Sequence, residues 1–238
     1  MAEWFQEWFG EDYLRLYPHR DAGEAARLVA LLRDRIPCRE GWSVLDVGCG
    51  PGRHLAAFES AGFLPVGMDL SRALLRRARE VTRRPLIRAD MRHLPIRPGR
   101  FDLVVNLFTS FGYFATDAEH VGVLGQMAGA LRPGGWLVMD FLNAPAVRSG
   151  LVPEETTTLA GQPVRIRRHL EQRDQTVVKT IETAEGRRFV ERVRLFDTPE
   201  LDAMLAGAGI DSRSRFGDYQ GAPLTPASPR AILIGQHP

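Results

Sequence analysis

The sequence predicts an α/β protein with a mostly parallel sheet, helices on both faces of that sheet, an N-terminal helical cap and an antiparallel β insert. Two observations predict the parallel part: short apolar segments alternate with amphipathic ones between about residues 43 and 141, and a glycine-rich turn directly follows the first apolar segment. A third predicts the insert, because apolar side chains recur at every second position between about residues 155 and 196. Alternating strands and helices form parallel sheets with right-handed crossovers, whereas period-two segments separated by turns are typical of antiparallel strands.

The elements of the parallel part follow from apolar spacing and from residues that end helices. Residues 11–36 are expected to be helical, because leucines recur at helical spacing up to Ile36 and Pro37 ends the run. Strands are expected at 43–47, 64–68, 85–88, 101–105, 136–141 and 230–235. The intervening helices are expected to bury Leu55 and Phe58, then Leu74, Leu75, Ala78 and Val81, then Val121, Leu124, Met127 and Leu131, and a last helix is expected from Thr198 to Ala208.

The insert is expected to form strands around Val164 and Ile166, over 177–181 and over 189–196, with turns at 173–174 and 185–186. A glycine and repeated prolines make residues 218–229 a loop. We therefore expect three parts. Residues 1–40 form a helical cap, residues 41–150 and 197–238 form the core, and residues 151–196 form an insert over the active site.

Composition limits the classes of partner. The net charge of +2 over 238 residues is too small to indicate nucleic-acid or membrane binding. Two cysteines form no disulfide framework and fit a reducing cytoplasm, and neither a signal-peptide pattern nor an apolar stretch of membrane-spanning length is found. Lys179 is the only lysine among 31 basic residues, which we attribute to genomic base composition. A monomer or a homodimer is expected.

The strongest local signal is the turn after the first strand. Gly48, Gly50 and Gly52 follow Asp46 at alternate positions, so the backbone turns tightly and approaches a ligand without intervening side chains. The next helix adds its N-terminal amides and positive dipole end. A nicotinamide dinucleotide fingerprint would place another glycine where Arg53 stands, and the Gly-Lys-Ser/Thr ending of a phosphate-binding loop is absent.

Acidic residues end the next two predicted strands. Asp69 follows the second strand, where a carboxylate can accept hydrogen bonds from both hydroxyls of a ribose. After the third strand, Asp90 is suited to accept from an adenine amino group and Met91 to cover a ring face. The pattern predicts a site for an adenosine-containing cofactor.

These motifs, in this order from Trp42 to Asn143, resemble those of the class I S-adenosylmethionine-dependent methyltransferases. The resemblance implies a Rossmann-like seven-stranded sheet whose final strand is antiparallel, with S-adenosylmethionine as the cofactor. It implies that the three glycines approach the methionine part, that Asp69 binds the ribose and that Asp90 and Met91 bind the adenine. The expected cofactor-binding residues of this region also include Asp46, Cys49, His54, Leu70 and Asn106.

Segments outside the core resemble small-molecule methyltransferases, including the nucleotide-sugar amine N-methyltransferases. They are residues 13–20, 108–113 and 228–230. The resemblance suggests a small-molecule methyl acceptor. Tyr13, Tyr17 and Arg20 are expected to close over the cofactor, with Arg20 meeting its carboxylate, although packing explains the tyrosines equally well. Tyr113 is expected to orient the acceptor and Arg230 to place a positive charge at the rim, so these two are the predicted catalytic residues.

Methyl transfer is a direct displacement, so alignment of the acceptor matters more than a nucleophile triad or a metal. No metal site is expected, because the six histidines lack metal-ligand spacing. His120 is interpreted as a helix-surface residue, with a role as a base as the alternative.

Three other functions compete with this interpretation. A non-catalytic S-adenosylmethionine-binding sensor would keep every cofactor motif. A nicotinamide-dependent oxidoreductase is disfavoured by Arg53 and by the lack of a Tyr-x-x-x-Lys motif. A nucleic-acid methyltransferase is disfavoured because Asn106 is followed by Leu-Phe-Thr and not by Pro-Pro-Tyr.

Overall fold

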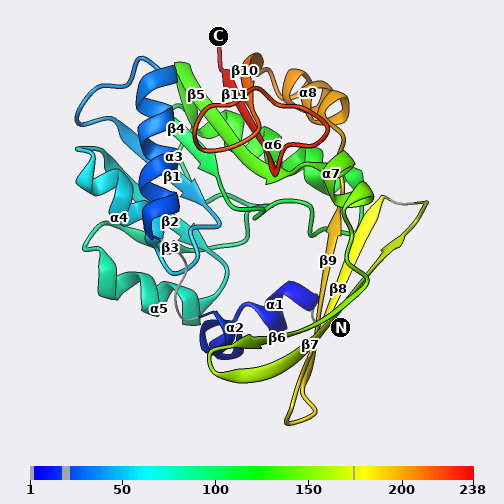
Figure 1. Cartoon of the computed structure of the whole chain (residues 1–238). Helices are drawn as coiled ribbons and strands as arrows, with labels where there is room; N and C mark the ends of the chain where they lie inside the picture. The colour runs from blue at the N-terminus through cyan, green and yellow to red at the C-terminus, as the bar shows by residue number, and fades with distance from the viewer. Residues whose placement is uncertain (1–2, 18–21, 174) are drawn as a thin grey trace.

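A seven-stranded sheet forms the centre of the computed structural model, which describes residues 3–17, 22–173 and 175–238 (Figure 1). The strand order is β10-β11-β5-β4-β1-β2-β3. Strand β11 runs in the opposite direction to the rest of the sheet, pairing antiparallel with β5 on one side and with β10 on the other. The strands are β1 Ser43–Val47, β2 Leu64–Asp69, β3 Leu86–Arg88, β4 Phe101–Asn106, β5 Leu131–Leu142, β10 Asp211–Phe216 and β11 Arg230–Gln236.

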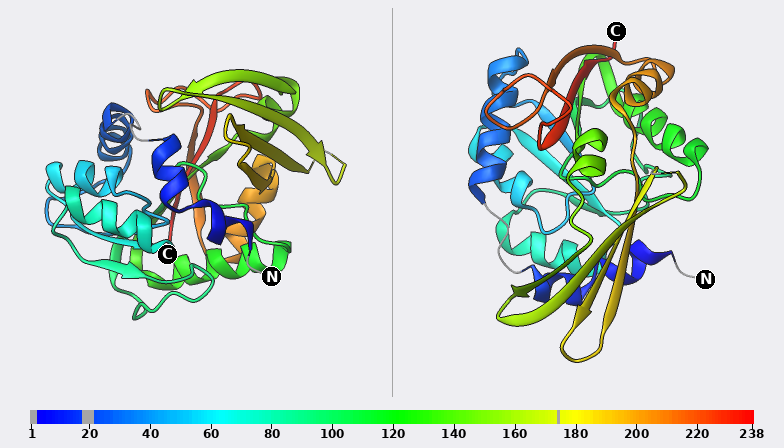
Figure 2. Two further views of the ribbon diagram at one scale, coloured as in Figure 1. Left: turned by 90° about the horizontal axis from the view of Figure 1, so that it is seen from below. Right: turned by 45° about the vertical axis from the view of Figure 1, so that its right-hand side comes forward.

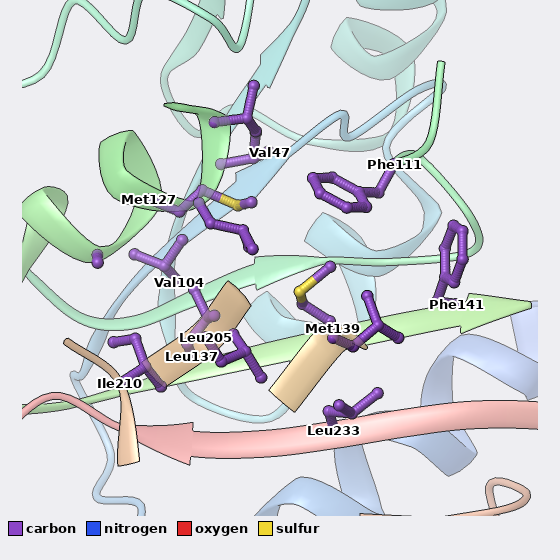
Figure 3. Close-up of a cluster of buried hydrophobic side chains, with 14 of the residues drawn as sticks. Val47, Val104, Phe111, Met127, Leu137, Met139, Phe141, Leu205, Ile210 and Leu233 are labelled. Carbon is purple, nitrogen blue, oxygen red and sulfur yellow. The ribbon is translucent and has the colours of Figure 1, made fainter. Parts of the chain in front are cut away.

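Helices cover both faces of this sheet because its central strands are apolar on both sides. In β1, Val44 packs in one cluster with residues of α3 and α4, whereas Leu45 and Val47 pack in another with residues of α6 and α8. Figure 3 shows part of the second cluster, in which Val47, Met127 and Leu205 come from three different elements. The helices are α3 Ala22–Arg35, α4 Arg53–Ser60, α5 Arg72–Val81, α6 Asp117–Ala130, α7 Ala144–Ser149 and α8 Thr198–Gly207.

The insert forms a separate four-stranded antiparallel sheet in the order β6-β7-β8-β9. The strands are β6 Glu154–Leu159, β7 Gln162–Glu171, β8 Thr176–Thr183 and β9 Arg188–Arg194. Two short helices, α1 Trp4–Trp8 and α2 Glu11–Leu16, lie beside this sheet in each view of the ribbon (Figures 1 and 2).

The N-terminal segment, residues 3–17, packs against the four-stranded sheet. Trp8 is buried there, 4.6 Å from the ring of Phe189, and its indole Nε1 donates to Glu191 Oε1 at 2.7 Å. Asp12 also forms an ion pair with Arg187, which lies in the turn between β8 and β9. Trp8 and Leu16 share an apolar cluster with Val164, Ile166 and Ile181 of the sheet.

The structure corrects several predicted elements. The helix expected over 11–36 is interrupted: α2 ends at Leu16 and α3 begins at Ala22. Strands β6 and β10 and helix α7 were not expected from the residue pattern. In α5, Val81 is exposed and not buried as expected. In α6, Val121 is exposed and Val123 takes the buried position. No helix in the described ranges is long and apolar enough to cross a membrane.

Candidate active site

Two neighbouring cavities lie at the carboxyl ends of the parallel strands. The first, of about 530 Å³, is lined by residues that directly follow β1 and β4, by the ends of β2 and β3, and by the start of α5. Such an edge is where open α/β sheets bind ligands. Ten of the sequence-predicted site residues line it: Tyr13, Gly48, Cys49, Gly50, His54, Asp69, Leu70, Asp90, Met91 and Tyr113.

The glycine turn shapes the floor of the first cavity. Gly48 has φ +82°, and a β-carbon on it would stand 2.7 Å from Ser110 Cβ. Gly50 has φ +54°, and a β-carbon there would meet nothing within 4 Å. The first glycine therefore permits close packing of the 108–113 loop, and the second leaves space inside the cavity.

Asp69 connects this turn to α5. Its Oδ2 accepts from the Gly50 amide and its Oδ1 from the Ser71 amide, both at 2.8 Å. Burial raises the pKa of Asp69, and these two amides oppose the increase. The carboxylate thus fixes the turn while it still lines the cavity.

Asp90 also lines this cavity and is held by Arg92. The guanidinium donates to both carboxylate oxygens of Asp90, from Nε at 3.1 Å and from Nη2 at 2.7 Å to Oδ2. Burial alone would raise the pKa of Asp90, but Arg92 holds it below its ordinary value. Arg92 also pairs with Glu3 and Glu119, so it links the N-terminal segment to the cavity wall.

Four of the predicted cofactor-binding residues that the structure describes do not line the first cavity. Tyr17 accepts a hydrogen bond from Lys179 Nζ at 3.0 Å and packs against the four-stranded sheet. Asn106 donates to the Val47 carbonyl at 2.8 Å. Gly52 precedes α4, packed against Ala78 of α5. Asp46 is buried, and its Oδ2 has no hydrogen-bond partner among the described residues. Arg20 lies outside the described residues.

The second cavity, of about 500 Å³, adjoins the first. Residues from the N-terminal segment, the 108–113 loop and the insert all line it, which is where the acceptor is expected to bind. Four aromatic residues line both cavities: Phe9, Tyr13, Phe108 and Tyr113. The two spaces therefore meet at an aromatic boundary.

Ion pairs line the second cavity. Arg168 pairs with Glu155 at 2.6 Å, and Lys179 pairs with Glu191 at 3.3 Å. Burial opposes the charge on Lys179, but Glu191 and Tyr17 together hold its pKa above the ordinary value. The predicted catalytic residue Arg230 also lines this cavity, and its Nε donates to Asp140 Oδ1 at 2.7 Å. Tyr113 donates its hydroxyl to the Thr109 carbonyl.

Comparison with known proteins identifies the family. A family model described as a methyltransferase domain matches residues 44–135. A dTDP-3-amino-3,4,6-trideoxy-α-D-glucopyranose N,N-dimethyltransferase from Streptomyces venezuelae is 30% identical over 237 residues, spanning 95% of this chain and 92% of its own length. The chain belongs to the S-adenosylmethionine-dependent methyltransferases.

Two further comparisons extend this result. The solved structure of CalS10 with S-adenosylmethionine bound, an amino pentose methyltransferase from Micromonospora echinaspora, has a TM-score of 0.70 and 26% identity, covering 100% of this chain and 99% of its own. A malonyl-[acyl-carrier protein] O-methyltransferase from Pseudescherichia vulneris is 30% identical over 205 residues, spanning 83% of this chain and 74% of its own length. These three relatives are named as methyltransferases, so none supports the non-catalytic alternative.

The protein is therefore an enzyme that transfers the methyl group of S-adenosylmethionine to a small-molecule acceptor. The first cavity fits this cofactor: its volume is ordinary for a small-molecule site, the space beside Gly50 is open and Asp69 presents a carboxylate there. When bound, S-adenosylmethionine supplies a methyl group on a positively charged sulfur. The methyltransferase needs to align the acceptor with that methyl group and to exclude water.

Two histidines of the methyltransferase, His120 and His54, are buried. His120 is fully buried, contrary to the surface position expected. Its Nε2 accepts from the Phe114 amide at 3.2 Å and its Nδ1 lies 2.8 Å from the Thr116 carbonyl, so both ring nitrogens are used in packing α6. His54 lines the first cavity, and burial together with Arg53 and Arg230 lowers its pKa to about 3. His54 is therefore neutral at physiological pH.

Sequence reasoning missed several residues of the methyltransferase's second cavity. Glu155, Arg168 and Glu191 lie on strands of the insert, and their common placement depends on strand register. Lys179 was attributed to base composition, yet it is largely buried against Tyr17 and Glu191. The presence of a single lysine in an arginine-rich chain was the one sequence feature that could have singled out Lys179.

Asp46 gives a testable pH dependence. Burial, with the nearby Asp69 charge, raises its pKa to about 7. The folded methyltransferase therefore binds a proton that the unfolded chain releases at lower pH, so Asp46 lowers stability as the pH rises from about 4 to about 7. We expect Asp46→Asn, which mimics the protonated form, to gain stability relative to the wild type across that range. Denaturant unfolding at several pH values measures this difference, and parallel profiles would contradict the expectation.

Proposed function

We propose that this methyltransferase N-methylates an amino sugar linked to a nucleoside diphosphate. The observation that carries the proposal is the similarity to the dTDP-amino-sugar N,N-dimethyltransferase over 95% of the chain. At that coverage the match includes the insert, which lines the second cavity. The malonyl O-methyltransferase match covers a smaller share of both chains and therefore gives weaker support for an oxygen acceptor.

In this proposal the first cavity binds S-adenosylmethionine. The Asp69 carboxylate accepts from the ribose hydroxyls, the backbone at Gly48 and Gly50 approaches the methionine part, and Asp90 and Met91 hold the adenine. Tyr13 closes the cavity from the N-terminal segment. All six residues line the same space, which supports these roles.

The second cavity would hold the sugar nucleotide. Arg168, Lys179 and Arg230 line it and suit a diphosphate, although each also has an acidic partner that the ligand would share. Glu155 and Glu191 suit the positive charge that the amine acquires when its lone pair bonds to the methyl carbon. The aromatic boundary excludes water where the two ligands meet, with Tyr113 orienting the acceptor.

Acceptor assays test this function. The enzyme is incubated with S-adenosylmethionine and one of three acceptors: a dTDP-linked amino sugar, the corresponding sugar nucleotide with a hydroxyl in place of the amine, or malonyl-acyl carrier protein. Among the three acceptors, we expect only the dTDP-linked amino sugar to give S-adenosylhomocysteine release above the acceptor-free control. Turnover of the malonyl carrier, with none of the amino sugar, would show that the proposed acceptor is wrong.

The remaining expectations belong to the same proposal. A monomer or a homodimer, no nucleic-acid partner and a reducing compartment such as the cytoplasm are compatible with the low net charge and the two free cysteines. The division into a cap of residues 1–40, a core and an insert of residues 151–196 also stays a prediction.

A further inference from the structure

Asp140, near the end of β5, collects hydrogen bonds from three separate segments. Its Oδ2 accepts from the Phe108 amide at 3.0 Å and from the Tyr219 hydroxyl at 2.7 Å, and its Oδ1 accepts from Arg230 Nε at 2.7 Å. Its backbone carbonyl accepts from the Thr109 amide at 2.9 Å. The side chain is 0% exposed. A buried carboxylate with this many donors is rigidly held, because loss of any partner would leave a polar group unpaired in a dry environment.

Two of these donors belong to a strained turn. Phe108 has φ +56° and Thr109 has φ +64°. Consecutive non-glycine residues in the left-handed region are strained and persist only where surrounding contacts impose them. The carboxylate and the carbonyl of Asp140 accept from the two amides of this turn, so this one residue holds both of them in place.

The turn stands where the two cavities meet. Phe108 lines both of them, and its ring lies 4.1 Å from the guanidinium carbon of Arg53 and 5.3 Å from that of Arg230. Arg230 also donates to Thr109 Oγ1 at 3.1 Å. The same carboxylate therefore sets the position of an aromatic wall and of a cation that lines the second cavity.

We propose that Asp140 is a positioning residue for methyl transfer: it fixes the Phe108–Thr109 turn and the Arg230 guanidinium at the boundary between the cofactor cavity and the acceptor cavity. Asp140 itself lines neither cavity. It acts through residues that do, so its loss should misalign the acceptor and leave the cofactor bound.

The chain provides a matched control. Asp102, at the other end of the sheet, accepts from the same kinds of donor as Asp140: a backbone amide and a hydroxyl, both of Ser43, and Arg132 Nε. Asp102 lines neither cavity. Asp140→Asn and Asp102→Asn therefore remove the same charge from the same kinds of hydrogen-bond donor, and only the first lies beside the proposed reaction site. Asp102 is 18% exposed, so its replacement should cost less stability than that of the fully buried Asp140.

The first measurement is steady-state kinetics with a dTDP-linked amino sugar, together with the Kd of S-adenosylmethionine. For Asp140→Asn we expect kcat to fall on the order of 10²-fold, the size of effect that misplaced reactants produce, with the cofactor Kd within about threefold of wild type. Asp102→Asn should keep kcat within about twofold. Wild-type kcat in Asp140→Asn, or a loss of cofactor affinity equal to the loss of turnover, would overturn the proposal.

This kinetic measurement rests on the proposed function, so a second measurement is independent of the acceptor. Hydrogen exchange of the cofactor-bound enzyme should show faster exchange in the peptide spanning residues 107–113 for Asp140→Asn and not for Asp102→Asn. Unchanged exchange there overturns the proposal. If the wild type fails to turn over the amino sugar, the proposed acceptor is wrong and the exchange result alone decides the role of Asp140.

A milder variant covers the case in which Asp140→Asn does not fold. Tyr219→Phe removes one hydroxyl donor to Asp140 and keeps the carboxylate charge. Faster exchange over residues 107–113 at unchanged cofactor Kd supports the proposal. Wild-type exchange in this variant, with Asp140→Asn unfolded, overturns it.

Discussion

Replacing Gly50 by alanine is expected to remove most of the affinity for S-adenosylmethionine. The added β-carbon would meet no protein atom within 4 Å, and Gly50 lines the first cavity, so the methyl group would occupy space that we assign to the cofactor. A displaced ligand of this kind loses at least about tenfold in affinity, or about 1.4 kcal/mol. Calorimetric titration with S-adenosylmethionine and S-adenosylhomocysteine measures the loss.

Gly99→Ala is the matched control for this variant. Gly99 also has a positive φ, +69°, and open space around its missing β-carbon, but it does not line the first cavity. Both variants should lose similar stability, roughly 1–2 kcal/mol, because alanine is strained in the left-handed region. Equal cofactor affinities in the two variants would mean that the cofactor does not pass beside Gly50.

Asp69→Asn is expected to weaken cofactor binding by roughly 1.5–3 kcal/mol, the usual value for hydrogen bonds to a charged group. The structure adds a second cause. The carboxylate holds the amides of Gly50 and Ser71, and an asparagine amide group would face one of these donors with another donor. The glycine turn should therefore loosen, and the melting temperature should fall together with the affinity.

The Asp102→Asn variant separates these causes for Asp69. It also disturbs a carboxylate that accepts a backbone amide, so it should lower the melting temperature and leave the cofactor Kd unchanged. Titration and thermal unfolding of both variants give the comparison. If Asp69→Asn kept wild-type affinity, the ribose would have to bind elsewhere in the cavity.

The central strands of the sheet were predictable because buried strands consist mostly of apolar residues. The central strands are buried on both faces, and their runs of apolar residues locate them within a residue or two. Strands β6 and β10 were missed for the opposite reason. Both are edge strands of mostly polar residues, which pair through their backbones and carry little apolar signal.

Two of the incorrect predictions concern single residues, Pro18 and His120. Pro18 disfavours helical geometry in the residue before it, and α2 indeed ends at Leu16. His120 was placed on a helix surface because it was considered by its own spacing alone. The structure closes the 108–113 loop over it, and three phenylalanine rings surround it within 5.2 Å.

The cofactor cavity was more predictable than the acceptor cavity. Its residues follow consecutive parallel strands, so chain order alone brings Gly50, Asp69 and Asp90 to one edge. Asp46 of β1 and Asn106 of β4 also lie near the ends of parallel strands, but both side chains are buried in the protein, and one position along a strand decides that difference. The contacts of Asp140 join segments up to 90 residues apart, and no local pattern predicts them.

The attachment of the N-terminal segment to the insert bears on how substrate preference can be re-engineered. Trp8, Asp12 and Tyr17 contact side chains of β8, of β9 and of the hairpin between them, although about 160 residues or more separate the partners in the chain. A chimera that exchanges only the insert between two homologues would break this interface and expose its aromatic side. Grafting a new acceptor preference therefore requires both segments to be transplanted from the same donor.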